Sequence, residues 1–183
     1  MANIQENSLH ISKEEKNGVT QELVKSLFDY KDGRLYWKIK TGPTVKVGNI
    51  SGYINNRGLR GCRYLIKMKG GVFIGARIIF LWHHGYLPEI VDHIDRDALN
   101  DKIENLRGAI REQNSRNRTS AKGSTSQYLG VSKDDNRWVV NISINKKQTF
   151  LGSFDDEKEA ALAYDEVAFK HFGEFANLNI KSR

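Results

Sequence analysis

Residues 91–117 hold eight short polar side chains, four aspartates and four asparagines, around a single histidine. Asp and Asn are poor helix formers, because their side chains compete for nearby backbone groups. The stretch is therefore either a series of turns or a site that coordinates something. We interpret 91–95 as a strand that ends in a polar turn, 106–107 as a second short strand, and 112–118 as a helix.

Two strands followed by a helix can place several of these side chains around one point. Asn114 and Asn117 are three residues apart, so on a helix they share a face. Oxygen ligands from Asp and Asn suit a hard cation such as Mg²⁺ or Mn²⁺, and a neutral histidine can take a proton from water. The plainer alternative is an Asn- and Asp-rich loop with a surface histidine. The four side chains expected to meet are Asp92, His93, Asn105 and Asn114.

The charge of the chain favours a polyanionic partner, most often nucleic acid. Its 29 Lys and Arg against 22 Asp and Glu give a formal charge of +7. The one cysteine, Cys62, excludes an internal disulfide and a Cys-based zinc site, and it fits a reducing cytoplasm. The longest apolar run is too short to cross a bilayer, and the start of the chain lacks a signal-peptide pattern. We therefore expect a cytoplasmic protein with no membrane partner.

The segment before this stretch alternates turns with short β-type runs. A helical turn or two is expected after Val19, and Asp32-Gly33 between aromatic flanks predicts a hairpin. Further short strands are expected at 48–53, 63–68 and 70–74, in a small twisted antiparallel sheet. Residues 76–84 then predict a helix, with Gly85 as its stop.

The pattern changes again after the small, polar segment 119–126, which has the composition of a linker. Residues 138–144 alternate with period two, a turn follows at 145–147, and 148–154 pairs back as another strand. Acidic residues from Asp155 open a helix with an apolar stripe. The expected fold class is α+β. The expected parts are a flexible tail (1–18), a first domain (19–118), a linker (119–126) and a second domain of three antiparallel strands with one packed helix (127–183).

Three ordered motifs in the central stretch resemble the HNH endonucleases, particularly the small phage and intron-encoded kind. They are Asp92-His93-Ile94-Asp95, Asn105-Leu106-Arg107 and Asn114-x-x-Asn117. The resemblance extends upstream to the β-rich region and helix, so that it covers about residues 28–118. It implies a nuclease with a ββα-metal core at about 88–118, in which a divalent ion and a histidine base act on a phosphodiester bond.

The resemblance also implies a role for each matching residue. His93 would be the general base that activates water, and Asn105 would brace the loop and orient His93. Asp92 and Asn114 would hold one Mg²⁺ or Mn²⁺ ion on the scissile phosphate, and Asn117 is a possible supporting residue. Two positions depart from the family pattern. Arg96 stands where the family often has Gly, and Ile110 where it often has a Ser or Thr helix cap.

The segment 126–180 resembles the AP2 domain, which is familiar from plant transcription factors and is also found attached to phage HNH nucleases. The matching motifs are Tyr128-Leu129-Gly130-Val131, residues 137–142, residues 150–154 and residues 160–165. The resemblance implies a sheet that lies in the DNA major groove. The guanine-reading arginines of the plant domains are replaced here by Leu129, Ser132 and Asp134, so base reading is not implied.

Strand alternation predicts which side chains of this sheet face DNA. If Trp138, Val140, Ile142 and Ile144 point inward, Asn141 and Ser143 point outward, at positions that face DNA in the AP2 family. Four basic residues on or near the sheet would contact phosphates: Lys133, Arg137, Lys146 and Lys147. The alternative is a module kept for protein contacts or packing.

Together these features predict a metal-dependent HNH DNA endonuclease, homing endonuclease-like, with an AP2-type module that positions it on double-stranded DNA. No small-molecule cofactor is expected. A phage protein that acts in the host cytoplasm follows from the resemblance. The alternative is a non-catalytic DNA-binding regulator that keeps the HNH fold as a scaffold. Intact Asp92, His93, Asn105 and Asn114 argue against it, because a scaffold does not need all four.

Overall fold

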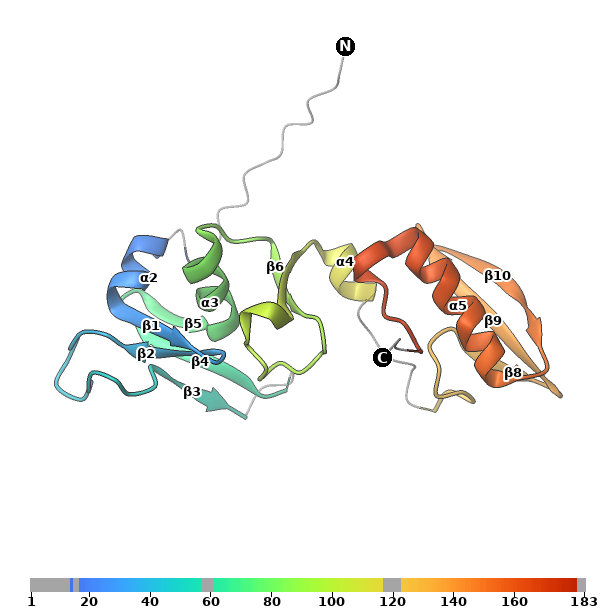
Figure 1. The fold of residues 1–183 in the computed structure, drawn as a ribbon, viewed down its shortest axis with the longest axis horizontal. Helices are drawn as coiled ribbons and strands as arrows, with labels where there is room; N and C mark the ends of the chain where they lie inside the picture. The colour runs from blue at the N-terminus through green and yellow to red at the C-terminus, as the bar shows by residue number, and fades with distance from the viewer. Residues whose placement is uncertain (1–13, 15–16, 57–60, 117–122, 181–183) are drawn as a thin grey trace, which may run out of the picture. The chain divides into compact units, whose positions relative to one another are not determined.

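The computed structural model of the 183-residue chain describes residues 14, 17–56, 61–116 and 123–180. It is a mixture of helices and small antiparallel sheets, which confirms the α+β class (Figure 1). The chain divides into two compact units, Met1–Ile110 and Arg111–Arg183. This division falls inside the segment 19–118 that the sequence assigns to one domain, and the predicted domain bounds stay a prediction. None of the described helices is long and apolar enough to cross a membrane.

The first unit begins with a helix and a hairpin. Helix α2 covers Gln21–Leu27, and strands β1 and β2 cover Phe28–Lys31 and Arg34–Trp37. Asp32 and Gly33 have φ values of 45° and 74°, as the two central residues of a type I′ turn require. The hairpin predicted from the Asp-Gly pair is confirmed.

A three-stranded antiparallel sheet follows, in the order β3-β4-β5. Its strands are Gly52–Asn55, Arg63–Met68 and Gly71–Ile74. Helix α3, Gly75–His84, packs against β4 and β5 and ends at Gly85, whose φ of 76° is the left-handed conformation expected of a helix stop (Figure 1). The sheet and helix predicted upstream of the Asn- and Asp-rich stretch are confirmed.

The hydrophobic core of the first unit lies between α2, α3, the hairpin and the inner face of this sheet. Removing apolar side chains from water is the main favourable term in folding, at about 25 cal/mol per Å². The side chains with no exposed surface in this core are Val24, Phe28, Leu35, Ile66, Ile78 and Ile79.

The predicted strand–strand–helix order is present in the Asn- and Asp-rich stretch. Strands β6 (Ile90–His93) and β7 (Leu106–Ala109) pair antiparallel, and a 3₁₀ turn, η1 (Ile103–Asn105), precedes β7. Helix α4 covers Arg111–Arg116 and is grouped with the second unit. Asn117 lies outside the described residues.

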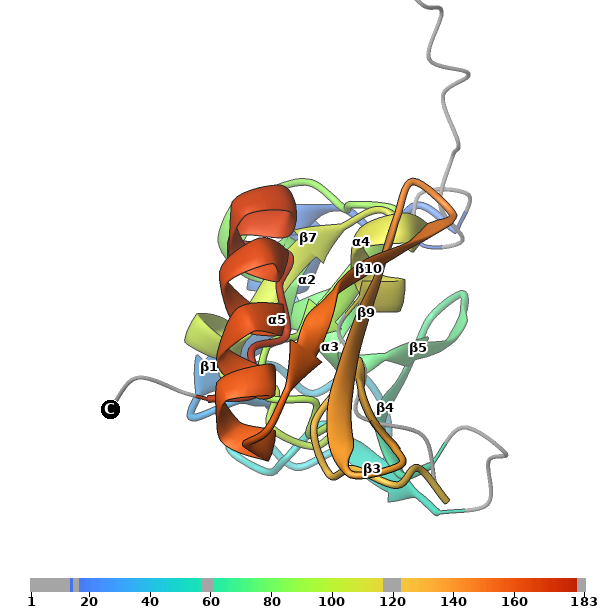
Figure 2. The same cartoon turned by 90° about the vertical axis from the view of Figure 1, so that its right-hand side faces the viewer.

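The second unit is the predicted three-stranded sheet with one helix. Strands β8 (Val131–Asp134), β9 (Arg137–Ile144) and β10 (Lys147–Phe154) form an antiparallel sheet with β9 at its centre. Helix α5, Glu157–Phe172, lies along one face of the sheet (Figure 2). Its N-cap, Asp156, accepts hydrogen bonds from two backbone amides of the first turn.

Of the predicted linker 119–126, the structure describes residues 123–126. Ser126 is buried, and its hydroxyl donates a hydrogen bond to Glu157 of α5 at 2.7 Å. This end of the segment is therefore attached to the second unit.

Candidate active site in the β6–β7 segment

The loop between β6 and β7 begins where β6 ends, at His93. The Arg96 amide donates to the His93 carbonyl at 3.0 Å, and Arg96 has a φ of 69°. A left-handed φ is unfavourable for a residue with a side chain and free of cost for glycine. This conformation explains why glycine suits the position at which the sequence departs from the HNH pattern.

Asn105 closes this loop from inside. Its Oδ1 accepts from the Asp95 amide at 3.0 Å, and its Nδ2 donates to Asp95 Oδ1 and to the Asn100 carbonyl at 2.9 and 2.8 Å. The Asn105 carbonyl also accepts from the Ile94 amide at 2.9 Å. Asn105 is 8% exposed, whereas Ile94 and Asp95 are exposed, so the bonds lie at the edge of the loop with Asn105 on its inner side.

The same hydrogen bonds act on the charge of Asp95. Burial alone would raise the pKa of Asp95, but bonds from Asn100, Asn105 and the Asp97 amide, with His93 nearby, hold that pKa below its usual value. The ionised form of Asp95 is therefore part of the closed loop.

His93 is held by a carboxylate that the sequence did not single out. Its Nε2 lies 2.7 Å from Oδ1 of Asp101, which is 1% exposed. The other carboxylate oxygen lies 3.3 Å from Nη1 of Arg34 in β2. Asp101 therefore sits between an imidazole and a guanidinium, and its negative charge has a partner on each side.

The β1–β2 hairpin packs directly on this loop. Arg34 Nη2 donates to the Leu99 carbonyl at 2.9 Å, and the Tyr30 hydroxyl accepts from the Ile103 amide at 3.0 Å. A Cβ atom at Gly33 would lie 2.8 Å from the backbone nitrogen of Lys102, so only glycine permits this approach. The loop is thus held from two sides, by Asn105 and by the hairpin.

Asp92 points to a different partner from that of His93. It faces Arg107 across the β6–β7 pair, and its Oδ2 accepts from Arg107 Nε and Nη2 at 3.0 and 2.9 Å. Asp92 is 7% exposed. A buried carboxylate with one cation beside it is both oriented and charge-balanced.

Asp92 offers a carboxylate oxygen and Asn114 an amide oxygen, and both donor types suit a hard divalent ion. In the described part of the chain, no three His, Cys, Asp or Glu side chains gather to hold a metal. The predicted ligand pair contains one carboxylate and one amide, so it would not form such a group of three. Asn114 is half-buried on α4, in the second unit.

The sequence reasoning missed Asp101 and Arg34. Four aspartates share the loop region, and nothing in the sequence separates Asp101 from the others. Arg34 lies 67 residues from Asp101 in the chain. Arg34 directly follows the Asp32-Gly33 turn of the hairpin that the sequence did predict, and this position is the one sequence feature that could have indicated Arg34.

The outer face of the β8–β10 sheet carries three of the six predicted DNA-contacting residues. Val140, Ile142, Trp138 and Ile144 join the core, as predicted, so the alternate positions face away from α5. Those positions hold Arg137, Asn141 and Ser143. Lys146 lies in the β9–β10 turn with a φ of 65°.

The other two lysines lie on the helix side of the sheet by register. Lys133 pairs with Trp138 and Lys147 pairs with Ile144, and both lysines are exposed. Lys133 Nζ lies 5.5 Å from the Trp138 ring centroid. The outer face also carries Phe150, opposite Asn141 and 62% exposed, which the sequence reasoning did not select.

Known proteins match both parts of the chain. The chain is 35% identical over 116 residues to an uncharacterized HNH endonuclease of Acanthamoeba polyphaga mimivirus, which covers 62% of this chain and 58% of that protein. It is 34% identical over 106 residues to Protein 3.8 of Escherichia phage T7, covering 55% of this chain and 87% of the phage protein. A 49-residue match at 41% identity, 27% of this chain and 11% of the relative, is to an AP2-like ethylene-responsive transcription factor of Arabidopsis thaliana.

The sequence profile of HNH endonucleases matches residues 76–116, from α3 to α4. This segment contains Asp92, His93 and Asn105 and the loop that they form. The resemblance seen in the ordered motifs is therefore confirmed. The chain belongs to the HNH endonuclease family.

Proposed function

We propose that this protein is a metal-dependent endonuclease that hydrolyses phosphodiester bonds in double-stranded DNA. The observation that carries the proposal is His93, at the end of β6, whose Nε2 lies 2.7 Å from the buried Asp101; the buried Asp92 precedes His93 in the chain. A histidine oriented by a second group can take a proton from the water that attacks a phosphodiester.

His93 acts as the general base through Nδ1. A carboxylate accepts hydrogen bonds, so Nε2 carries the hydrogen that it donates to Asp101, and the lone pair of the neutral ring is then on Nδ1. Asp101 is a positioning residue: it selects this tautomer and stabilises the ring when Nδ1 takes a proton from water. Arg34 and Asn105 hold the loop around this pair.

Asp92 and Asn114 would hold a divalent ion, Mg²⁺ or Mn²⁺, through one carboxylate and one amide oxygen. When bound, Mg²⁺ or Mn²⁺ would offset the negative charge that develops on the scissile phosphate and the leaving oxygen. Arg107 fixes the rotamer of Asp92 through its two hydrogen bonds to Oδ2. Asn117, one turn beyond Asn114 on the predicted helix, would support Asn114.

The second unit is an AP2-type module that positions the nuclease on DNA. The match to the plant factor and the three-stranded sheet with one helix support this role. Arg137, Asn141 and Ser143 would face the groove, and Lys146 would contact phosphate. Lys133 and Lys147 would reach phosphates from the flanks of the sheet. The phage relative supports an action in the cytoplasm of an infected cell.

One observation favours the alternative, a non-catalytic DNA-binding protein. Oδ2 of Asp92 accepts two hydrogen bonds from Arg107, so the predicted metal ligand already has a cationic partner. In a scaffold that binds no metal, this ion pair would replace the metal site.

A plasmid-cleavage assay separates the two functions. Supercoiled DNA is incubated with the full chain and Mg²⁺ or Mn²⁺, with and without excess EDTA. We expect nicked or linear DNA only with metal, and a ~10²–10⁴-fold lower rate for His93→Ala. His171→Ala removes an exposed histidine of α5 and serves as the matched control. Cleavage by His93→Ala at the wild-type rate would exclude His93 as the base. If the wild-type protein itself did not cut DNA with either metal, the non-catalytic DNA-binding function would be favoured.

A further inference from the structure

Positive charge is concentrated in one part of the first unit. Residues 33–88 contain ten Lys and Arg and no Asp or Glu, while the whole chain has a net charge of +7. The remainder of the chain is therefore net negative. A run of 56 residues without a carboxylate attracts polyanions.

Some of these basic side chains lie on the outer face of the β3–β5 sheet. Tyr64 and Ile66 of β4 point into the core, so the alternate residues of β4 face away from it. Lys67 is exposed there and pairs with Val72 of β5. Tyr53 of β3 shares this face and is 51% exposed.

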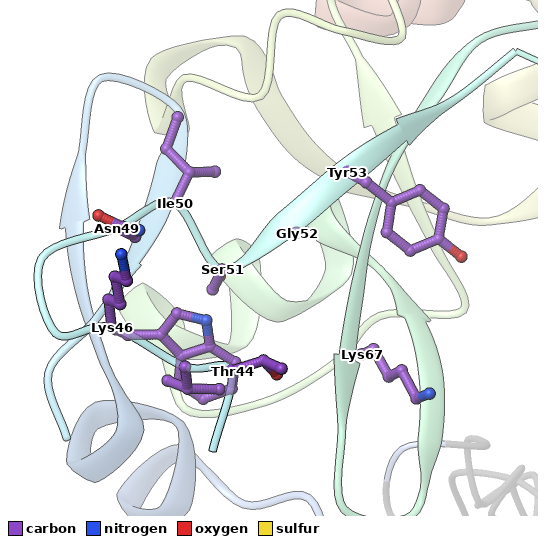
Figure 3. Close-up of a pocket in the computed structure, with 10 residues that line it drawn as sticks. Thr44, Lys46, Asn49, Ile50, Ser51, Gly52, Tyr53 and Lys67 are labelled. Carbon is purple, nitrogen blue, oxygen red and sulfur yellow. The ribbon is translucent and has the colours of Figure 1, made fainter. Parts of the chain in front are cut away.

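A groove of about 320 Å³ opens beside this face. Figure 3 shows Lys46, from the loop before β3, and Lys67, from β4, on opposite sides of Ser51, with Tyr53 above Lys67. None of the described residues that line the groove is Asp or Glu. Among the described residues, neither Lys46 nor Lys67 takes part in a salt bridge.

The groove and the candidate active site share strand β2. Arg34 reaches Asp101 from the start of this strand, and Trp37, at its end, lines the groove. Three residues of extended strand span about 10 Å. The side chains of Arg34 and Trp37 leave opposite faces of β2, because they are three residues apart. The groove therefore lies in the same unit as the catalytic loop, on the other face of a strand that also contacts this loop.

We propose that this groove binds backbone phosphates of the substrate DNA, with Lys46 and Lys67 as the phosphate contacts. The proposal rests on the proposed nuclease function, because it takes the occupant to be the DNA that is cut. The two lysines of the groove, the absence of Asp and Glu from residues 33–88, and its place in the same unit as the catalytic loop favour the DNA backbone over an acidic protein. The groove would hold the duplex in place next to His93, independently of the second unit.

Binding of a fluorescent 30-base-pair duplex to the full chain tests this, at several salt concentrations and in EDTA, so that no cleavage occurs. Each phosphate contact contributes about one unit to the slope of log K against log salt. Lys46→Gln/Lys67→Gln should lower the slope by about two units and weaken binding at least tenfold at 0.15 M salt. Lys158→Gln/Lys170→Gln makes the same charge change on exposed positions of α5 and should leave the slope near the wild-type value.

The two proposals fail separately. Equal slopes for the groove variant, the α5 variant and the wild type would overturn the groove as a DNA site, even if plasmid cleavage depends on His93. A groove-dependent slope without cleavage would leave the groove standing and remove the nuclease function. Lys46→Arg/Lys67→Arg should restore the slope, and failure to restore it, with thermal melting unchanged, would also count against the phosphate contacts.

Discussion

Asp101 is the residue on which the orientation of His93 depends. Asp101→Asn keeps the shape of the side chain and removes its charge. We expect cleavage to fall by about 10–100-fold, as is typical when the group that orients a functional histidine is changed. Single-turnover cleavage rates of the wild type and the variant check this effect.

A charge-matched variant in the same loop separates this role from general destabilisation. Glu104→Gln also removes one negative charge, at an exposed position, and should leave the rate unchanged. If Glu104→Gln lowered the rate as much as Asp101→Asn, the special role of Asp101 would be lost.

Arg96 gives a prediction about stability rather than catalysis. Its φ of 69° places a side chain in the left-handed region, which costs about 1–2 kcal/mol relative to the right-handed one. Arg96→Gly removes this cost but adds backbone entropy to the unfolded chain. We expect a net gain of about 0.5–1 kcal/mol in the free energy of unfolding, measured by urea denaturation. A loss of stability would show that the Arg96 side chain makes contacts that outweigh the strain.

At the scale of elements, Asn179 fastens the C-terminal segment to the rest of the second unit. Its side chain accepts from the Leu129 amide at 2.7 Å and donates to the Leu129 carbonyl at 3.1 Å. Asp165 of α5 accepts from the amides of Asn179 and Ile180, each at 2.7 Å. The segment thus connects α5 to the start of the β8–β10 sheet.

Asn179→Ala should therefore destabilise the second unit. The Leu129 amide and carbonyl would lose their partners in a half-buried place, at a cost of about 1–3 kcal/mol. Hydrogen exchange of β8 and α5 amides should become faster while α3 amides keep their protection. Asn136→Ala, at an exposed position of the turn between β8 and β9, is a control of the same residue type. Equal effects of the two substitutions would remove the special role of Asn179.

Local signals in the sequence were enough to predict most elements. Asp32-Gly33 and the turn after Ile144 adopt the left-handed φ values that such hairpin turns need, and Gly85 ends α3 as predicted. The contact between Arg34 and Asp101 could not be predicted, because it depends on how the hairpin packs against a distant loop. Several aspartates in that loop have the same local surroundings in the sequence, and only the fold shows that one of them faces His93.

At the scale of the whole molecule, the two units are expected to divide the work of binding DNA. A fragment of residues 1–118 keeps the groove and the catalytic loop and loses the AP2-like sheet. It should still cut DNA but bind more weakly, with a shallower salt dependence, because contacts such as Arg137 and Lys146 each contribute about one unit of slope. Titrating the fragment and the full chain against one duplex at several salt concentrations checks this.

The truncation also has an outcome that would change the reading of the second unit. If affinity and salt slope were the same with and without residues 119–183, the C-terminal part would not be a DNA-binding module. A role in protein contacts would then replace it. Because the guanine-reading arginines are absent, we expect the second unit to add affinity more than choice of sequence.

The hairpin that supports the catalytic loop limits how this nuclease can be recombined. A chimeric enzyme built from residues 76–116 alone, the part that matches the family profile, would lack Arg34 and Tyr30. Asp101 would then lose its guanidinium partner and the hairpin that covers it, so the loop that orients His93 would no longer be held from that side. A fusion of this catalytic segment to another DNA-binding protein therefore has to include the residues from before Gln21 onward, so that it contains both the hairpin and the loop.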